Sequence, residues 1–177
     1  LRRITSDPGD EDDPVFSPDG TRIAYWGYTD QSLRVTDEAG TTILASGIGC
    51  FPIYYVTPVW SPDGRWIIYP VDREPSGECL DDTLDLYIIP ADGSEPGRRW
   101  LSENVLAYSA YAAWAPDGRI AYQAWNGKEA QLMVATVTDP EAPFDLAAHE
   151  VSQPGYYGRY SWMMPQWSPD GTMIASM

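Results

Sequence analysis

A short phrase occurs four times in this chain and limits its possible folds more than any other feature. The copies begin at Phe16, Trp60, Trp114 and Trp167. Each copy has an aromatic residue, then a turn containing Pro-Asp-Gly, then a short run that includes isoleucine. The turn residues, in chain order, are Ser17, Pro18, Asp19 and Gly20; Ser61, Pro62, Asp63 and Gly64; Pro116, Asp117 and Gly118; and Ser168, Pro169, Asp170 and Gly171.

The phrase predicts two strands joined by a tight turn. Proline fixes φ at the second turn position, serine can hydrogen-bond the turn backbone, and glycine supplies a positive φ at the end. A turn that ends in a left-handed residue suits a β-hairpin. Aromatic and β-branched residues beside a Gly/Pro cluster favour strands. The third copy has Ala115 in place of serine, so the serine hydrogen bond is dispensable there.

The spacing of the copies predicts the architecture. They begin 44, 54 and 53 residues apart. Repeats of about 40–50 residues with one hairpin signature each are typical of propeller blades with four strands. The alternative is a β-sandwich in which such turns recur by chance, but four copies with the same flanking residues argue against it. The sequence therefore predicts an all-β protein, a β-propeller of four-stranded antiparallel blades.

The phrase also resembles the repeat of TolB-type, WD40-like propellers, known as PD40 repeats. The resemblance covers the whole chain at the level of blades. It is specific for the fold and much less so for function, because the same repeat builds TolB, the propellers of prolyl-oligopeptidase-like peptidases, and many other secreted or periplasmic proteins. It implies that ligands bind on the face opposite the repeated turns.

The positions of the turns divide the chain into blades. We expect an outer strand of a preceding blade at 1–5, blade one at 14–45, blade two at 55–101, blade three at 108–148 and the start of blade four at 162–177. Three complete blades fall below the usual minimum of about four, and unpaired strand edges associate readily. We therefore expect an open arc or a piece of a larger propeller, with edge-to-edge self-association if the chain stands alone.

Individual strands follow from the hydrophobic runs around each turn. They are predicted at 14–16, 22–28, 32–36 and 41–45; at 55–60, 66–71, 84–89 and 98–101; and at 108–114, 119–124, 131–136 and 144–148. The longer connections are predicted as loops on the face opposite the repeated turns, where a rigid scaffold commonly carries binding residues. They are 7–13, 47–55, 72–83, 103–111 and 150–162.

Acidic and aromatic residues in these loops are the candidate ligand-binding groups. Aromatic rings and carboxylates together suit a sugar or a basic peptide. The candidates are Asp10, Asp12, Tyr54, Tyr55, Tyr111, Tyr157 and Trp162. The alternative is that most loop rings pack between blades, as we expect for Phe16, Trp60, Trp114 and Trp167. The acidic run at 10–13 lacks the spacing of a calcium loop, so we expect a solvated loop there.

The two cysteines are candidates for one disulfide bond. Cys50 lies in the predicted link into blade two, and Cys79 lies in a long loop of the same blade on the same face. A bond between them would stabilise the fold by about 3–4 kcal/mol in the chain-entropy account. It requires an oxidising compartment; two free thiols are the alternative.

Several function classes are disfavoured by composition and motifs. The net charge of −15 argues against a nucleic-acid or anionic-membrane surface, and no apolar run is long enough to span a bilayer. There is no G-x-S-x-G, no Gly-rich phosphate loop, and one histidine, His149. We expect no catalytic residue, cofactor or metal in this chain.

Two functions remain at this point. The first is a non-catalytic TolB-like propeller in the periplasm or outside the cell, which binds a protein or a glycan on its loop face. The second is the substrate-filtering propeller of a prolyl-oligopeptidase-like serine peptidase whose hydrolase domain lies outside this chain.

Overall fold

A computed structural model describes residues 4–5, 9–48, 57–72, 83–106, 112–125, 128–137, 149–150 and 164–176. These residues form strands, turns and connecting segments. No helix within these ranges has the length and apolarity needed to cross a membrane.

The strands form three blades and a final hairpin in chain order. Blade one contains β1 (Glu11–Phe16), β2 (Ile23–Gly27), β3 (Ser32–Thr36) and β4 (Thr41–Ala45). Blade two contains β5 (Val59–Trp60), β6 (Trp66–Asp72), β7 (Thr83–Pro90) and β8 (Arg98–Leu106). Blade three contains β9 (Ala112–Trp114), β10 (Arg119–Trp125), β11 (Ala130–Thr136) and β12 (His149–Glu150). The C-terminal hairpin contains β13 (Gln166–Trp167) and β14 (Ile174–Ala175).

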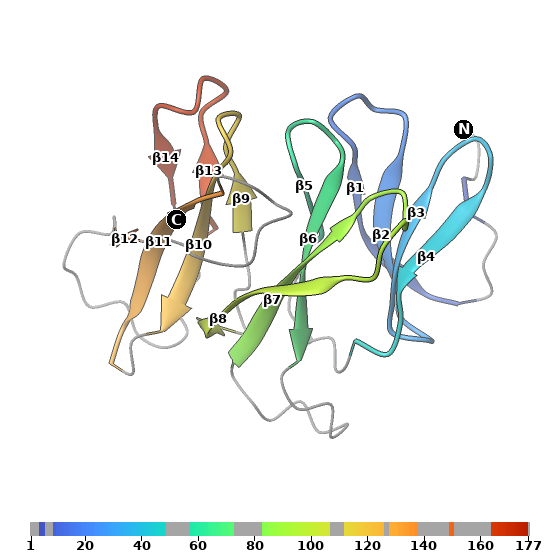
Figure 1. The fold of residues 1–177 in the computed structure, drawn as a ribbon, viewed down its shortest axis with the longest axis horizontal. Coiled ribbons are helices and arrows are strands. Elements are labelled where there is room, and N and C mark those ends of the chain that lie inside the picture. Colours follow the sequence, from blue (N-terminus) through green and yellow to red (C-terminus); the bar gives the residue numbers. More distant parts are fainter. Residues whose placement is uncertain are drawn as a thin grey trace.

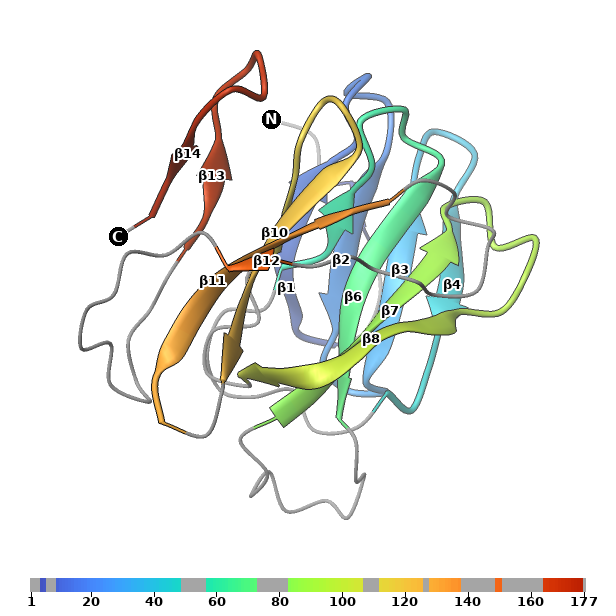
Figure 2. The same ribbon diagram turned by 60° about the vertical axis from the view of Figure 1, so that its left-hand side comes forward.

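Consecutive strands within each blade pair antiparallel, as a propeller requires. Blade one and the C-terminal hairpin lie at opposite ends of the molecule, so the described strands form an open arc (Figure 1). The four repeated turns lie at the same edge of this arc in both views (Figures 1 and 2). This edge is called the turn face below. The all-β, partial-propeller prediction is confirmed.

Blades two and three are less separate than the sequence predicts. Strand β8 continues to Leu106, beyond the predicted end at Leu101, and its Val105 pairs with Ala124 of β10. The extension of β8 follows from the length of β7. The first residues of β7, Thr83 and Leu84, pair with Leu106 and Val105 of β8. The prediction of a loop at 103–111 is therefore wrong for 103–106.

The core lies between the blades, and the alternation of strand side chains divides it. In β6, Ile67 and Tyr69 pack toward blade one with Trp26 and Leu33. The residues between them in sequence, Trp66 and Ile68, pack with blade three. Because successive strand residues point to opposite faces, blade two packs against a neighbouring blade on both of its faces.

The repeated turns have the predicted geometry. Gly20, Gly64, Gly118 and Gly171 have φ values of 71°, 68°, 90° and 68°. In the first turn the Ser17 hydroxyl donates to Asp19 and accepts from the Arg22 N–H at 2.9 Å. Equivalent bonds occur at Ser61 and Ser168.

The third turn explains why its serine is dispensable. Ala115 N–H bonds to the carbonyl of Arg119, four residues on, whereas Ser17 N–H bonds to that of Arg22, five residues on. Because the third turn is one residue shorter, it lacks the backbone N–H that donates to the serine hydroxyl in the other turns.

Neighbouring blades are connected by a recurring interblade joint. The Trp60 indole N–H donates to the Val15 carbonyl at 3.1 Å, and the Trp167 indole repeats this to Ala113 at 3.0 Å. Trp114 holds the same position between blades two and three. Its indole nitrogen is buried without a hydrogen-bond partner among the described residues.

Phe16 corrects a further prediction. Its side chain is 63% exposed, so it does not pack between blades. Trp60 and Trp167 each rest on the first strand of the preceding blade, and the described residues provide no such strand for Phe16.

Three further predicted loops also contain strand residues, and in the loop at 72–83 these are its end residues, Asp72 of β6 and Thr83 of β7. Residues 11–13 belong to β1, where Glu11 and Asp12 pair with Gly27 and Trp26. A register shift between Asp12 and Val15 accommodates Pro14, which has no N–H to donate. At the other end, His149 pairs with Val134 on the open edge of β11, so 149–150 is strand. The outer strand predicted at 144–148 lies outside the described residues.

Candidate functional site

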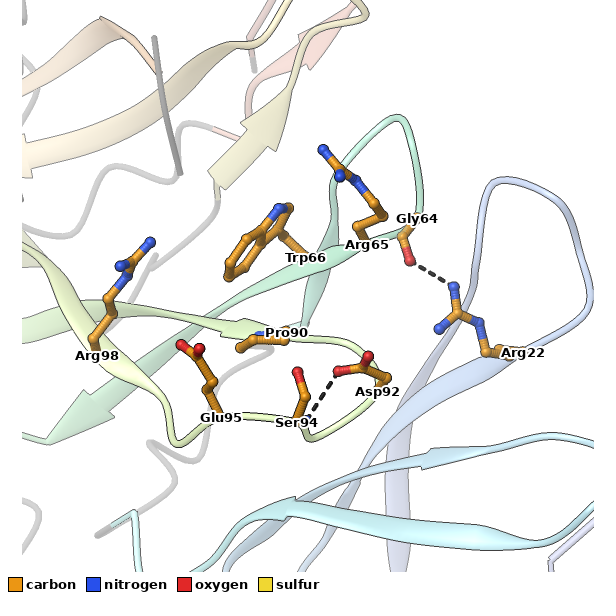
Figure 3. A pocket seen from close by; sticks show the side chains of 9 residues that line it. All are labelled: Arg22, Gly64, Arg65, Trp66, Pro90, Asp92, Ser94, Glu95 and Arg98. Carbon is orange, nitrogen blue, oxygen red and sulfur yellow. Dashed lines mark hydrogen bonds between the residues drawn. The ribbon is translucent and has the colours of Figure 1, made fainter. Parts of the chain in front are cut away.

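A pocket of about 500 Å³ opens beside the turn face at blades one and two. Three segments line it: the β1–β2 turn, the β5–β6 turn, and the β7–β8 turn with the start of β8. The lining residues are Arg22, Gly64, Arg65, Trp66, Pro90, Asp92, Ser94, Glu95 and Arg98 (Figure 3). The volume is in the range of small-ligand sites.

Arg22 crosses from blade one to blade two and closes one end of the pocket. Its guanidinium donates to the Gly64 carbonyl at 2.5 Å and lies 4.8 Å from the centre of the Trp60 ring. The left-handed glycine brings this carbonyl within reach, and a Cβ there would lie 3.3 Å from the guanidinium. The residue that joins the two blades therefore also lines the pocket.

Trp66 and Arg98 form the opposite end. Trp66 is 8% exposed, and the Arg98 guanidinium lies 5.6 Å from its ring centre. Arg22 and Arg119 occupy the position of Trp66 in the first and third repeats. An aromatic ring at this position in blade two provides an apolar wall where the first and third repeats have a cation and the fourth has Met173.

The acidic residues come from the β7–β8 turn. Hydrogen bonds from Ser94, together with the nearby Arg22, hold the pKa of Asp92 below its usual range. Glu95 is exposed and lies on the Arg98 side of this turn (Figure 3). Gly93 makes the tight turn possible, with a φ of 69°. Both carboxylates thus line the pocket that contains three arginines.

Arg65 completes the lining. Its side chain is 74% exposed and pairs with Asp63 at 2.8 Å, within the repeated turn. Arg119 makes the equivalent contact with Asp117 in blade three. The Arg65 ion pair thus belongs to the turn, and its side chain borders the pocket from above in Figure 3.

The lining of the described pocket contains no histidine. Within the described ranges, no three His, Cys, Asp or Glu side chains are placed to hold a metal ion. Ser94 lies beside Asp92 without a histidine, so the described pocket lacks the base of a Ser-His-Asp site.

The predicted ligand-binding residues are only partly described. Asp10 and Asp12 are exposed at the end of blade one away from the turn face. Tyr54, Tyr55, Tyr111, Tyr157, Trp162, Cys50 and Cys79 lie outside the described residues, so the loop-face site and the disulfide remain predictions.

Sequence reasoning missed the pocket because it treated the repeated turns as scaffold. One signal was available: Trp66 is the position at which blade two departs from the arginine of its neighbours. No local pattern indicates that Asp92, Glu95 and Arg98 lie beside it.

Comparisons with curated proteins find two relatives, and no family model matches the chain. The uncharacterized protein Atu1656 of Agrobacterium fabrum is 27% identical over 179 residues, which is 90% of this chain and 52% of that protein. The uncharacterized peptidase YuxL of Bacillus subtilis is 31% identical over 112 residues, which is 60% of this chain and 16% of that protein.

Solved structures agree on the fold. TolB from Acinetobacter baumannii matches 97% of this chain with a TM-score of 0.68 and 16% identity. The chain has a TolB-like β-propeller fold. A putative TolB from Agrobacterium tumefaciens matches 93% of this propeller chain, with a TM-score of 0.64 and 18% identity. A puromycin hydrolase matches 95%, with a TM-score of 0.59 and 17% identity.

This chain spans only part of the length of the proteins it matches. It spans 52% of the Agrobacterium fabrum relative, 38% of the Acinetobacter TolB chain, 52% of the Agrobacterium TolB chain and 27% of the hydrolase chain.

Proposed function

We propose that this chain is part of a non-catalytic, TolB-like binding propeller that acts in the periplasm or outside the cell. Its partner is a protein or a glycan, held on the loop face opposite the repeated turns. The observation that carries the proposal is the TolB-like fold, and within the described part no cluster of His, Cys, Asp or Glu is placed to hold a metal ion.

The charge supports a basic or neutral partner. The chain carries a net charge of −15, and Asp10 and Asp12 are exposed at the loop face. Such a surface attracts cationic protein segments and accelerates their association at low salt.

The test compares the chain with versions altered on each face. Peptide and glycan arrays should retain at least one ligand whose binding falls after Asp10→Asn with Asp12→Asn, but not after Arg65→Gln on the turn face. Loss of binding only in the turn-face variant would contradict a loop-face partner. The periplasmic, secreted and cytoplasmic fractions of cells making the tagged parent protein test the location.

A second candidate is the substrate-filtering propeller of a serine peptidase. The 31% identity to YuxL and the structural match to a puromycin hydrolase favour it. The parent coding sequence discriminates: a G-x-S-x-G followed by Asp and His supports the peptidase, whereas further Ser-Pro-Asp-Gly repeats up to the stop codon support the binding propeller. Labelling of the parent protein by a fluorophosphonate provides the biochemical equivalent.

A further inference from the structure

We propose that the turn-face pocket binds the free carboxyl terminus of a peptide. This site is distinct from the loop face, so it is a second binding site rather than a refinement of the function proposed above.

The charge of the pocket differs from that of the molecule around it. Three arginines and two carboxylates line it, whereas the whole chain carries −15. Because Arg65 is paired with Asp63, the guanidinium groups of Arg22 and Arg98 are the cations of the lining that attract an anion to this part of an acidic protein. Asp92 and Glu95 oppose a dianion such as phosphate, so a singly charged carboxylate fits the balance best.

Guanidinium groups and carboxylates complement each other in geometry. Each guanidinium offers five N–H donors in a planar fork that can bind a carboxylate through two bonds. Arg22, Arg65 and Arg98 line the pocket from three different segments, and Arg22 and Arg98 stand at its two ends, whereas Arg65 borders it while paired with Asp63 (Figure 3).

The remaining lining suits the rest of a peptide. Glu95 and Asp92 can accept hydrogen bonds from backbone N–H groups of the residues before the terminus. Trp66 and Pro90 form an apolar wall for the last side chain. A small carboxylate such as acetate can contact only the arginines, whereas a peptide can also contact the carboxylates and the apolar wall. A peptide terminus should therefore bind more tightly than acetate.

The pocket is largely formed before a ligand arrives. Arg22 is held by Gly64 and Trp60, Asp92 by Ser94, and Arg98 by its position over Trp66. Side chains that are already ordered lose little entropy on binding, which favours affinity.

Calorimetric titration of the whole 177-residue chain tests the proposal with acetyl-Ala-Ala-Ala-Leu, its C-terminal amide, acetate and inorganic phosphate. We expect the free acid to bind at least about tenfold more tightly than the amide, because a charge-assisted hydrogen bond is lost in the amide. It should also bind more tightly than acetate, and its affinity should fall as salt is raised.

The repeats supply a matched control. Arg22→Gln and Arg119→Gln remove equivalent contacts at two interblade joints, but only Arg22 lines the pocket. We expect Arg22→Gln and Arg65→Gln to weaken peptide binding several-fold and Arg119→Gln to leave it unchanged, with folding checked by circular dichroism.

Several results would overturn the proposal. They are equal binding of acid and amide, tighter binding of phosphate or acetate than of the peptide, no binding of any probe, or equal losses in the Arg22 and Arg119 variants. Binding to the loop-face partner should be unaffected by Arg65→Gln, so the two proposals can fail independently.

Discussion

The guanidinium of Arg22 lies 4.8 Å from the centre of the Trp60 ring, although the two residues belong to neighbouring blades. Arg119 and Trp167 repeat this relationship at 4.6 Å. In both cases the arginine also donates to the carbonyl of a turn glycine in the next blade, at 2.5 Å. The two interblade joints therefore combine a cation–π contact with a hydrogen bond.

We expect Arg22→Ala and Arg119→Ala each to lower the free energy of unfolding by about 1–2 kcal/mol. Urea denaturation measures the change. The two losses should add, because the joints are separate and share no contact. Arg65→Ala is the control, since this exposed side chain should contribute within about 0.5 kcal/mol. If Arg22→Ala lowered the free energy of unfolding no more than Arg65→Ala does, the joint would not contribute to stability as proposed.

The three interblade tryptophans should respond differently to the same substitution. Phenylalanine at position 60 or 167 removes an indole N–H that donates to a backbone carbonyl. At Trp114 it removes a buried N–H without an acceptor among the described residues. We expect Trp60→Phe and Trp167→Phe to cost about 1 kcal/mol more than Trp114→Phe. Equal midpoints of thermal unfolding for the three variants would refute this.

The turn serines provide a third test. Ser61→Ala leaves the N–H of buried Trp66 without its acceptor and should cost about 1–3 kcal/mol. Ala115→Ser in the shorter third turn should add no stability, because the N–H it would accept is absent there. Chemical denaturation of both variants checks the pair; a gain at position 115 would show that our account of turn length is incorrect.

Stability should depend on pH through two turn carboxylates. Hydrogen bonds from Ser17 and Thr21 lower the pKa of Asp19 to about 2, and those from Ser168 and Thr172 do the same for Asp170. Both folded-state pKa values lie below the ordinary 3.8, so the two ionised carboxylates stabilise the folded state fully at pH values above 3.8. It is lost as the pH falls toward 2.

Urea midpoints measured between about pH 5 and pH 2 should therefore fall, and less so in a variant with Asp19→Asn and Asp170→Asn. Two-dimensional NMR titration of the carboxyl groups measures the two pKa values directly. Ordinary values near 3.8 would rule out this source of acid sensitivity.

The disulfide prediction concerns residues beyond the described ranges. If Cys50 and Cys79 are bonded, mass spectrometry after alkylation without reductant should find no modified thiol. Reduction should then lower stability by about 3–4 kcal/mol. Two alkylated thiols in the native protein would exclude the bond.

Much of the fold could be predicted because its signals are local. The Pro-Asp-Gly turns imposed their geometry wherever they occurred, and the strand predicted at 32–36 coincides with β3. The extension of β8 could not be predicted in this way. It depends on backbone groups of Thr83 and Leu84 that become available only when β7 is in place.

The turn-face pocket was missed for the same physical reason. Arg22, Trp66 and Arg98 are far apart in sequence, and the joint and the β7–β8 turn bring them to one site. Periodicity and turn chemistry describe neighbours along the chain, whereas a pocket made by three turns depends on how blades are stacked.

The shorter third turn has an evolutionary consequence. The third turn lacks both one residue and the serine, and with that residue it lacks the backbone N–H that donates to the serine hydroxyl in the other turns, so we expect the two differences to be inherited together. In related genes, an insertion between Gly118 and Arg119 should occur together with a serine codon at 115. Alignments of such repeats should therefore treat the length of the turn and the residue at its first position, Ala115 in the third copy, as one inherited character.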